Sequence, residues 1–184
     1  VATLFNAFYG LLMAWVLTRY DFPGKRILDA LMDVPFALPT AVAGISLTAL
    51  YSANGWFGGP LQAMGIELVY TLGGVMLAMA FTSTPFVVRA IQPVLEDLDP
   101  ALEQAAMTLG ARPFAIFRRV VLPAILPAWL AGSTVAFARS LGEFGAVVFI
   151  AGNLPFKTEI AALLAYIRLE EYDYQGAAAI ALVL

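Results

Sequence analysis

Long stretches without a charged residue set the strongest limit on what this chain can fold into. Residues 1–18, 34–66 and 68–88 carry no Asp, Glu, Lys or Arg, and 120–150 carries only Arg139 and Glu143. Hydrophobic residues make up 61% of the sequence and charged residues 12%, with a mean hydropathy of +0.85. A span of about 20 apolar residues crosses a bilayer as a helix, which satisfies its own backbone hydrogen bonds there. We therefore expect an all-α, polytopic transmembrane helical bundle.

About five spans are expected. The three uncharged runs and the segment 120–150 give the first four, the second of them ending near Tyr51, and a fifth begins at Gln175. Pro35 and Pro39 lie at the entrance of the second span. They predict either a capped helix start or unwound backbone lining a path. Because the chain starts and stops inside apolar runs, we expect one membrane domain over 1–184, a fragment with sequence missing at both ends.

The residue types that the sequence lacks exclude several kinds of metal site and catalytic site. The chain has no Cys and no His, which excludes disulfides and the commonest transition-metal ligands. It also has no phosphate-binding P-loop and none of the usual nucleophile–base arrangements. We expect a chain that is not an enzyme, binds no cofactor or metal of its own and recognises no nucleic acid, so any energy source lies in another protein.

The basic residues of the connections predict the orientation. Cytoplasmic loops carry an excess of Lys and Arg. The connections on one side hold seven such residues and those on the other side two: Arg19, Lys25, Arg26, Arg89, Arg112, Arg118 and Arg119 against Lys157 and Arg168. This places the segment of about 93–123 in the cytoplasm.

The segment 93–123 is predicted to form two short helices around a turn. Asp99 is a good N-cap, followed by Pro100 at the first helical position and Glu103 in the first turn. Gly110 is expected to end this helix with a positive φ, and Pro113 to start a second one. A membrane protein that devotes its longest polar connection to such a pair is expected to present it to a soluble partner.

The spacing within this segment resembles the EAA motif of ABC importer permeases, carried here by Ala105, Ala106, Gly110, Leu122 and Pro123. The resemblance implies that the helix before Gly110 is a coupling helix, which sits in a cleft of a separate ATPase subunit. We call 93–123 the coupling segment. The sequence departs from the motif at Gln104, where the family has Glu, and Glu103 is the neighbouring carboxylate expected to substitute for it.

Further stretches resemble the CysT-type subunit of sulfate/thiosulfate ABC permeases: PFALPTAVAGI, ARSLGEFGAVVFIAGN, KTEIAALL and EEYDYQGAAAIA. The resemblance covers nearly the whole chain and implies a type I ABC importer fold translocating sulfate or thiosulfate. It implies as partners an ATP-binding subunit that holds ATP and Mg, a second permease of the CysW type and an external sulfate-binding protein. The expected location is a bacterial inner (plasma) membrane, crossed several times, with a plastid envelope as the alternative.

Two charges inside the fourth apolar run have two interpretations. Arg139 and Glu143 are four residues apart, so they can pair on one helix face. Charges within a membrane usually pair or face a cavity. They form either a structural pair or, with Ser140, part of a translocation path or gate in which Arg139 lowers the barrier for a dianion.

Three other functions remain open from the residues. The chain is alternatively a molybdate or tungstate permease, an ion-coupled secondary transporter that uses broken helices and Glu143, or a non-transporting scaffold. Dependence on an ATPase and on an external binding protein separates the ABC importers from the last two. Competition between anions separates sulfate from molybdate.

Overall fold

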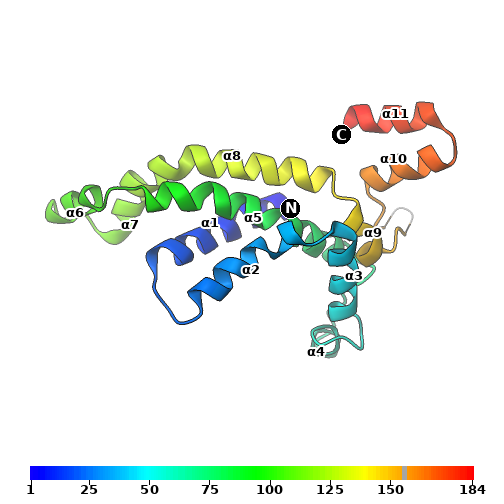
Figure 1. Cartoon of the computed structure of the whole chain (residues 1–184), viewed down its shortest axis with the longest axis horizontal. Helices are drawn as coiled ribbons and strands as arrows, with labels where there is room; N and C mark the ends of the chain where they lie inside the picture. Colours follow the sequence, from blue (N-terminus) through cyan, green and yellow to red (C-terminus); the bar gives the residue numbers. More distant parts are fainter. Residues whose placement is uncertain (155–156) are drawn as a thin grey trace. The chain divides into compact units, whose positions relative to one another are not determined.

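The computed structural model describes residues 1–154 and 157–184, and every regular element in these ranges is helical (Figure 1). The predicted all-α class is confirmed. In chain order the elements are α1 (Ala2–Arg19), α2 (Lys25–Ala37), α3 (Thr40–Tyr51), α4 (Gly58–Ala63), α5 (Leu72–Glu96), α6 (Pro100–Thr108), α7 (Pro113–Ile116), the π-helix η1 (Phe117–Val121), α8 (Leu122–Leu141), α9 (Gly145–Ala151), α10 (Ala161–Glu170) and α11 (Tyr174–Val183).

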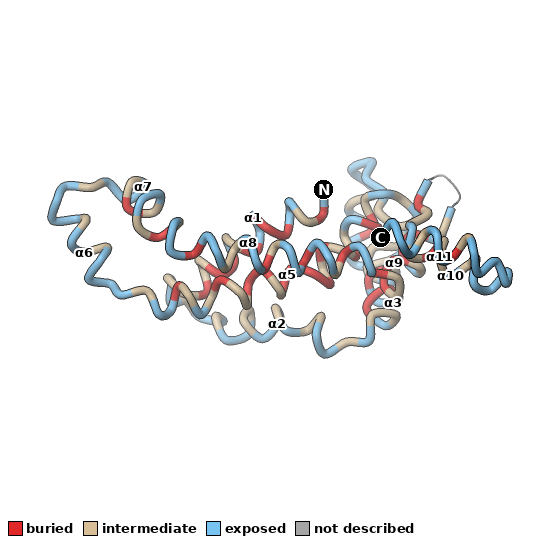
Figure 2. The backbone as a smooth tube through the Cα atoms, turned by 90° about the horizontal axis from the view of Figure 1, so that it is seen from above, coloured by how far each residue is buried: buried red, intermediate tan, exposed pale blue. Residues whose placement is uncertain are grey.

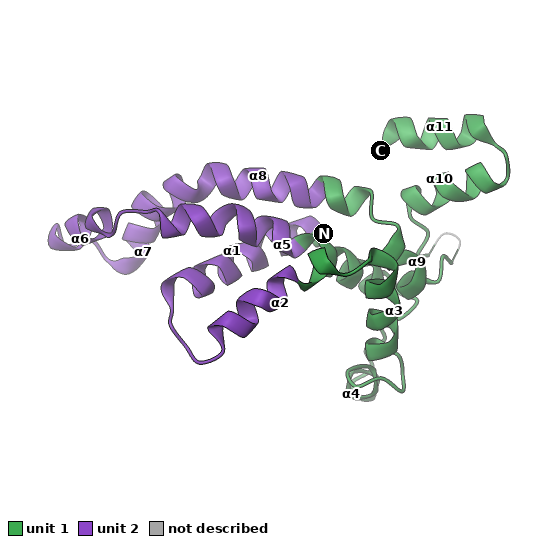
Figure 3. Cartoon of the chain, in the orientation of Figure 1, with its two compact units in different colours: residues 1–2, 34–83, 138–184 green, residues 3–33, 84–137 purple. Residues whose placement is uncertain are grey.

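The helices form two compact units (Figure 3). Unit 1 contains Val1–Ala2, Val34–Ser83 and Ala138–Leu184, and unit 2 contains Thr3–Asp33 and Thr84–Phe137. Helices α2, α5 and α8 each run from one unit into the other. The single membrane domain expected over 1–184 stays a prediction, since contact units are not a measure of independent folding.

The core of unit 2 is built by α1, the second half of α5 and the start of α8. Met13, Leu17, Val87, Ile91 and Ile125 are among its buried members. Figure 2 shows buried stretches in red along the labelled helices α1, α5 and α8. Two glycines let helices approach closely: a Cβ on Gly10 would lie 2.7 Å from Val87 Cβ, and one on Gly132 would lie 2.7 Å from Ala90 Cβ. Small residues at such crossings are typical of membrane helix packing.

The core of unit 1 is centred on α3 and α9. Leu47, Ala146 and Ile150 are buried there beside residues of α5. A Cβ on Gly44 would lie 2.5 Å from the backbone oxygen of Ala146, so α3 and α9 touch almost backbone to backbone. In α10, the nearby carboxylate of Glu170 raises the pKa of the Tyr166 phenol above its usual range.

Among the described residues, two helices are long and apolar enough to cross a membrane: Leu72–Glu96, and Pro113–Leu141, which joins α7, η1 and α8. Helices α2 and α3 make a third candidate if the bent pair is counted as one span. The chain breaks between Ala37 and Thr40, and Pro39 is the N-cap residue of α3, without a side-chain cap hydrogen bond. Whether this backbone lines a path stays a prediction. Length and apolarity therefore support two or three of the about five predicted spans, because α1 and α11 fall short of these criteria.

Two predicted boundaries were wrong. Helix α5 does not stop at Val88 but continues through Arg89 to Glu96, because carboxylates from α2 neutralise Arg89 as described below. The apolar run 120–150 is not one helix, since α8 ends at Leu141 and α9 begins at Gly145. Arg139 therefore lies in the last turn of α8, and Glu143 lies in the break that follows.

Candidate functional site

Helix α6, within the coupling segment, begins with an N-cap, as the sequence predicts. The side chain of Asp99 accepts a hydrogen bond from the backbone N–H of Ala101, with 2.9 Å between Oδ1 and N. Pro100 occupies the first turn, where its missing N–H leaves nothing unsatisfied. Nine residues then form α6, and no residue of this helix is buried.

Gly110 ends α6 in a Schellman motif. Its φ is 79°. The N–H of Gly110 donates to the Met107 carbonyl at 2.9 Å, and the N–H of Ala111 donates to the Ala106 carbonyl at 3.1 Å. These two bonds satisfy carbonyls that a helix end otherwise leaves open. The predicted positive φ is thus confirmed, and the motif fixes the direction in which the chain leaves α6.

The surface of α6 is exposed and largely apolar. Gln104 and Ala105 are exposed, whereas Ala106 is half-buried. Around them, Leu102 is 53%, Met107 57% and Leu109 88% exposed. We call these six residues the α6 face. Apolar side chains gathered on one short polar connection are typical of a surface that another protein covers.

The chain returns to the long helix through a π-helical turn. Pro113 starts α7, as predicted, and η1 follows from Phe117 to Val121. The N–H of Leu122 donates to the carbonyl of Phe117, five residues earlier. Leu122 packs against the core of unit 2, whereas Pro123 is exposed. A proline displaces the carbonyl four residues before it, and for Pro123 this carbonyl, on Arg119, lies inside the widened turn.

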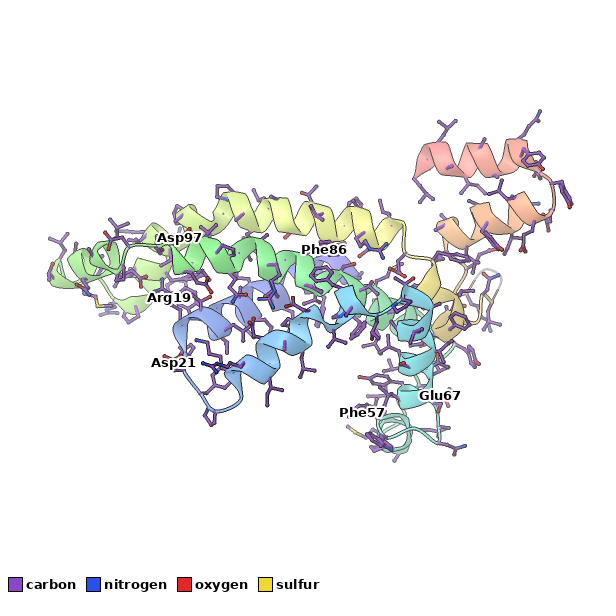
Figure 4. All side chains as sticks on the ribbon, viewed as in Figure 1. Arg19, Asp21, Phe57, Glu67, Phe86 and Asp97 are labelled. Atoms are coloured by element: carbon purple, nitrogen blue, oxygen red, sulfur yellow. The ribbon has the colours of Figure 1, made fainter. Side chains whose placement is uncertain are left out.

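Glu103 does not extend freely from α6. Its carboxylate forms an ion pair with the guanidinium of Arg19. Arg19 is the last residue of α1 and is labelled in Figure 4. The two side chains are 18% and 23% exposed. Sequence reasoning placed Arg19 in a loop and did not find this pair, because the two residues are 84 positions apart and no local pattern connects them. The carboxylate is thus held toward α1, and its expected contact with a partner protein stays a prediction.

Arg139, Ser140 and Glu143 come together in unit 1. Glu143 is 1% exposed, and its Oε2 lies 3.5 Å from Nη2 of Arg139, an ion-pair distance without hydrogen-bond geometry. Its Oε1 accepts from the backbone N–H of Ala146 at 3.0 Å, in the first turn of α9. The hydroxyl of Ser140 is hydrogen-bonded to that of Ser83 at 3.0 Å. The expected pair therefore forms, but across a helix end rather than along one helix face.

A second cluster was missed from the sequence. Arg89 donates from Nε and Nη2 to both oxygens of Asp33, at 2.8 and 2.7 Å, and from Nη1 to Asp29 at 2.7 Å. Its Nη1 also donates to Gln92 at 2.6 Å. These bonds join α2 to α5 within unit 2. Arg89 thus lies inside a helix, as do Arg19, Lys25 and Arg26, and the orientation inferred from seven basic residues against two stays a prediction.

Comparison with known proteins gives the family. The family model "Binding-protein-dependent transport system inner membrane component" matches residues 7–184. The chain is 59% identical over 184 residues to the sulfate transport system permease protein CysT of Salmonella typhimurium and 58% identical to that of Escherichia coli. It is 53% identical over 183 residues to a probable sulfate transport system permease protein of Nephroselmis olivacea.

The whole chain is aligned with each of these three relatives, but it spans only 66%, 66% and 64% of their respective lengths. The family match covers the coupling segment and the cluster around Arg139 and Glu143. The chain therefore belongs to the family of inner membrane components of binding-protein-dependent transport systems.

Proposed function

We propose that this chain is a permease subunit of an ATP-driven ABC importer that carries sulfate or thiosulfate across a membrane. The observation that carries the substrate class is the match along the entire chain, at 47–59% identity, to relatives named as sulfate transport permeases. These relatives do not favour the molybdate or tungstate alternative. Family membership also disfavours an ion-coupled secondary transporter and a scaffold, since the family consists of binding-protein-dependent transport components.

The α6 face is the proposed docking surface for the ATPase. Leu109 and Met107 are well exposed at the end of the helix, and the Schellman motif at Gly110 fixes their presentation. Burying about 1,000 Å² or more is usual for a stable interface, so the partner must also cover flanking residues such as Phe114, which is 74% exposed. Closure of an ATPase dimer then displaces α6 and drives the alternation of inward-open and outward-open states.

The remaining partners follow from the same proposal. An external sulfate-binding protein delivers the anion, and a second permease of the CysW type completes the path. ATP and Mg bind to the ATPase, so this chain holds no cofactor. The bacterial inner membrane, crossed several times, is the proposed location, and a plastid envelope is the alternative.

Arg139 and Ser140 are the proposed groups on the path. Sulfate keeps two negative charges, and its desolvation requires donors or a cation. The Arg139 side chain is 39% exposed even though its carboxylate partner is buried, so part of the guanidinium remains available. Glu143 pairs with Arg139 through one carboxylate oxygen. Through the other it accepts the N–H of Ala146 and so stabilises the break between α8 and α9.

Uptake of radiolabelled sulfate in a host lacking its own permease tests the proposal. Sulfate uptake should appear only when the ATPase and the binding protein are present, and excess thiosulfate should compete while molybdate does not. Uptake without the ATPase would indicate a secondary transporter. Stronger competition by molybdate than by thiosulfate would assign the chain to the alternative anion class.

A further inference from the structure

We infer that Arg19 and Glu103 form a clasp that fixes the coupling helix to the end of α1, so that the two helices move together. This inference rests on the proposed function, because it concerns how motion of α6 reaches the membrane helices. It makes Arg19 a positioning residue for coupling. It also assigns Glu103 to the interior of this chain rather than to the ATPase.

The burial of the pair supports a fixed geometry. The Arg19 and Glu103 side chains are only 23% and 18% exposed, and Nε of Arg19 is buried without a hydrogen-bond partner among the described residues. A partly buried cation in this position depends on its carboxylate, because removal of one partner leaves the other charge poorly solvated. Exposed pairs are weaker and rearrange easily; an example is Lys25 with Asp21, whose side chain is 98% exposed.

An aromatic contact extends the clasp to the other side of Gly110. The guanidinium carbon of Arg19 lies 5.3 Å from the centre of the Trp15 ring, a distance typical of a cation–π interaction. Trp15 in turn meets the ring of Phe117 edge to face, with centroids 5.3 Å apart and planes at 84°. Trp15 and Arg19 are four residues apart on α1 and share one face.

One face of α1 therefore holds both arms of the coupling segment: α6 through Glu103, and the π-helical turn through Phe117. The Gly110 turn between them is held by its own backbone bonds, and no atom lies within 4 Å of the position a Cβ would take. These backbone bonds set the local direction of the chain, and the contacts of Glu103 and Phe117 attach both arms to α1. With both arms anchored, a displacement of α6 is passed to α1 and to its buried residue Leu17.

The test compares four variants of the assembled transporter: Arg19→Gln, Glu103→Gln, the exchange Arg19→Glu with Glu103→Arg, and Lys25→Gln as the control in an exposed pair. We expect both single variants to keep the ATPase subunit and its ATP hydrolysis within about twofold of the wild type. The amount of sulfate imported per ATP should fall about tenfold. The exchange should recover a third or more of that ratio, and the control should match the wild type.

Three results would overturn the clasp. One is wild-type coupling in both single variants. Another is loss of the ATPase subunit in Glu103→Gln but not in Arg19→Gln, which would place Glu103 at the partner interface. The third is an exchange variant no better than the single ones.

A second measurement separates the clasp from the proposed function. The chain has no Cys, so Thr108→Cys offers one site for a nitroxide label on α6, and spectra are recorded on the purified protein in nanodiscs. Arg19→Gln should increase the mobility of the label, while Lys25→Gln should not. Increased mobility without any sulfate import by the wild type would refute the transport proposal but retain the clasp. Unchanged mobility would refute the clasp.

Discussion

Gly110 has a φ of 79° and open space where a Cβ would project. A larger residue here would meet no steric clash with neighbours, only the cost of adopting a positive φ. A β-branched residue in the left-handed region costs about 1–2 kcal/mol. We expect Gly110→Val to redirect the end of α6 and displace Leu109 from the α6 face. The ATPase should then no longer co-purify with this chain, as measured by the ratio of the two subunits after affinity isolation.

Gly65 provides a control matched in strain. Its φ is 77°, and no atom lies within 4 Å of its Cβ position either, but it lies in unit 1, after α4. Gly65→Val should keep the ATPase at the wild-type ratio. Equal losses in the two variants would attribute the effect to general destabilisation and not to docking.

Substitutions at Arg139 and Glu143 can separate a role in the path from a structural role. Arg139→Gln leaves the carboxylate of Glu143, which is 1% exposed, without its cation. If Arg139 serves the path, sulfate uptake should drop about tenfold or more while the complex assembles normally. If the pair is structural, the double variant Arg139→Gln with Glu143→Gln should restore uptake, because the amide introduced by Glu143→Gln keeps an oxygen for the N–H of Ala146 and no buried charge remains.

The control for this comparison is Arg168→Gln. Arg168 also pairs with a carboxylate close to it in the sequence, Glu171, but both side chains are well exposed, at 45% and 54%. Uptake should therefore be unaffected. A loss as large as that of Arg139→Gln would show that the assay responds to any change of charge on this part of the chain.

At the scale of the helix pair, Arg89 acts as a staple between α2 and α5. It makes a two-bond contact with Asp33 and another bond with Asp29, and its side chain is 29% exposed. Helix α2 has no fully buried residue, and only partly buried side chains such as Leu28 and Met32 pack against the core of unit 2, so these bonds add to its attachment. Arg89→Gln should lower the stability of the purified protein by about 1–2 kcal/mol, or roughly 2–8 °C in Tm.

Two further variants, Arg89→Lys and Lys25→Gln, test whether the geometry of the Arg89 contacts matters. Arg89→Lys should recover little of the loss, because an ammonium group lacks the planar fork that binds both oxygens of Asp33. Lys25→Gln, in the exposed pair with Asp21, should leave Tm within about 1 °C. Full recovery of Tm in Arg89→Lys would mean that charge alone holds α2.

The elements also show what the sequence can and cannot predict. Helix ends set by local chemistry, at Asp99–Pro100 and Gly110, were predicted correctly because cap, proline and glycine signals act within a few residues. The end of α5 was misplaced, and the clasp was missed, because Arg89 and Arg19 meet carboxylates 56–60 and 84 residues away. A charged residue in a membrane protein indicates a loop unless a carboxylate neutralises it, and the sequence does not show partners this far away.

At the scale of the whole molecule, the orientation remains a prediction from seven basic residues against two. The lack of native Cys makes it directly testable. Gln62→Cys in α4 should react with a membrane-impermeant maleimide in intact cells, whereas Thr108→Cys in α6 should react only after permeabilisation. Labelling in the reverse order would place the coupling segment outside and remove its access to any cytoplasmic ATPase.

The π-helical turn at Phe117–Val121 determines where the chain can lose a single residue without exposing its buried face. Ile116, Val121 and Ile125 are 3%, 0% and 0% exposed, so the first step between buried residues is five positions and the second is four. In an unbroken α-helix a five-residue step would rotate the side chain about 140° away from the preceding one. The widened turn absorbs one surplus residue and keeps the apolar stripe continuous. Loss of one residue from this turn would leave the steps at four and four, an ordinary α-helix with the same buried face, whereas a loss elsewhere in α8 would rotate the rest of the helix out of register.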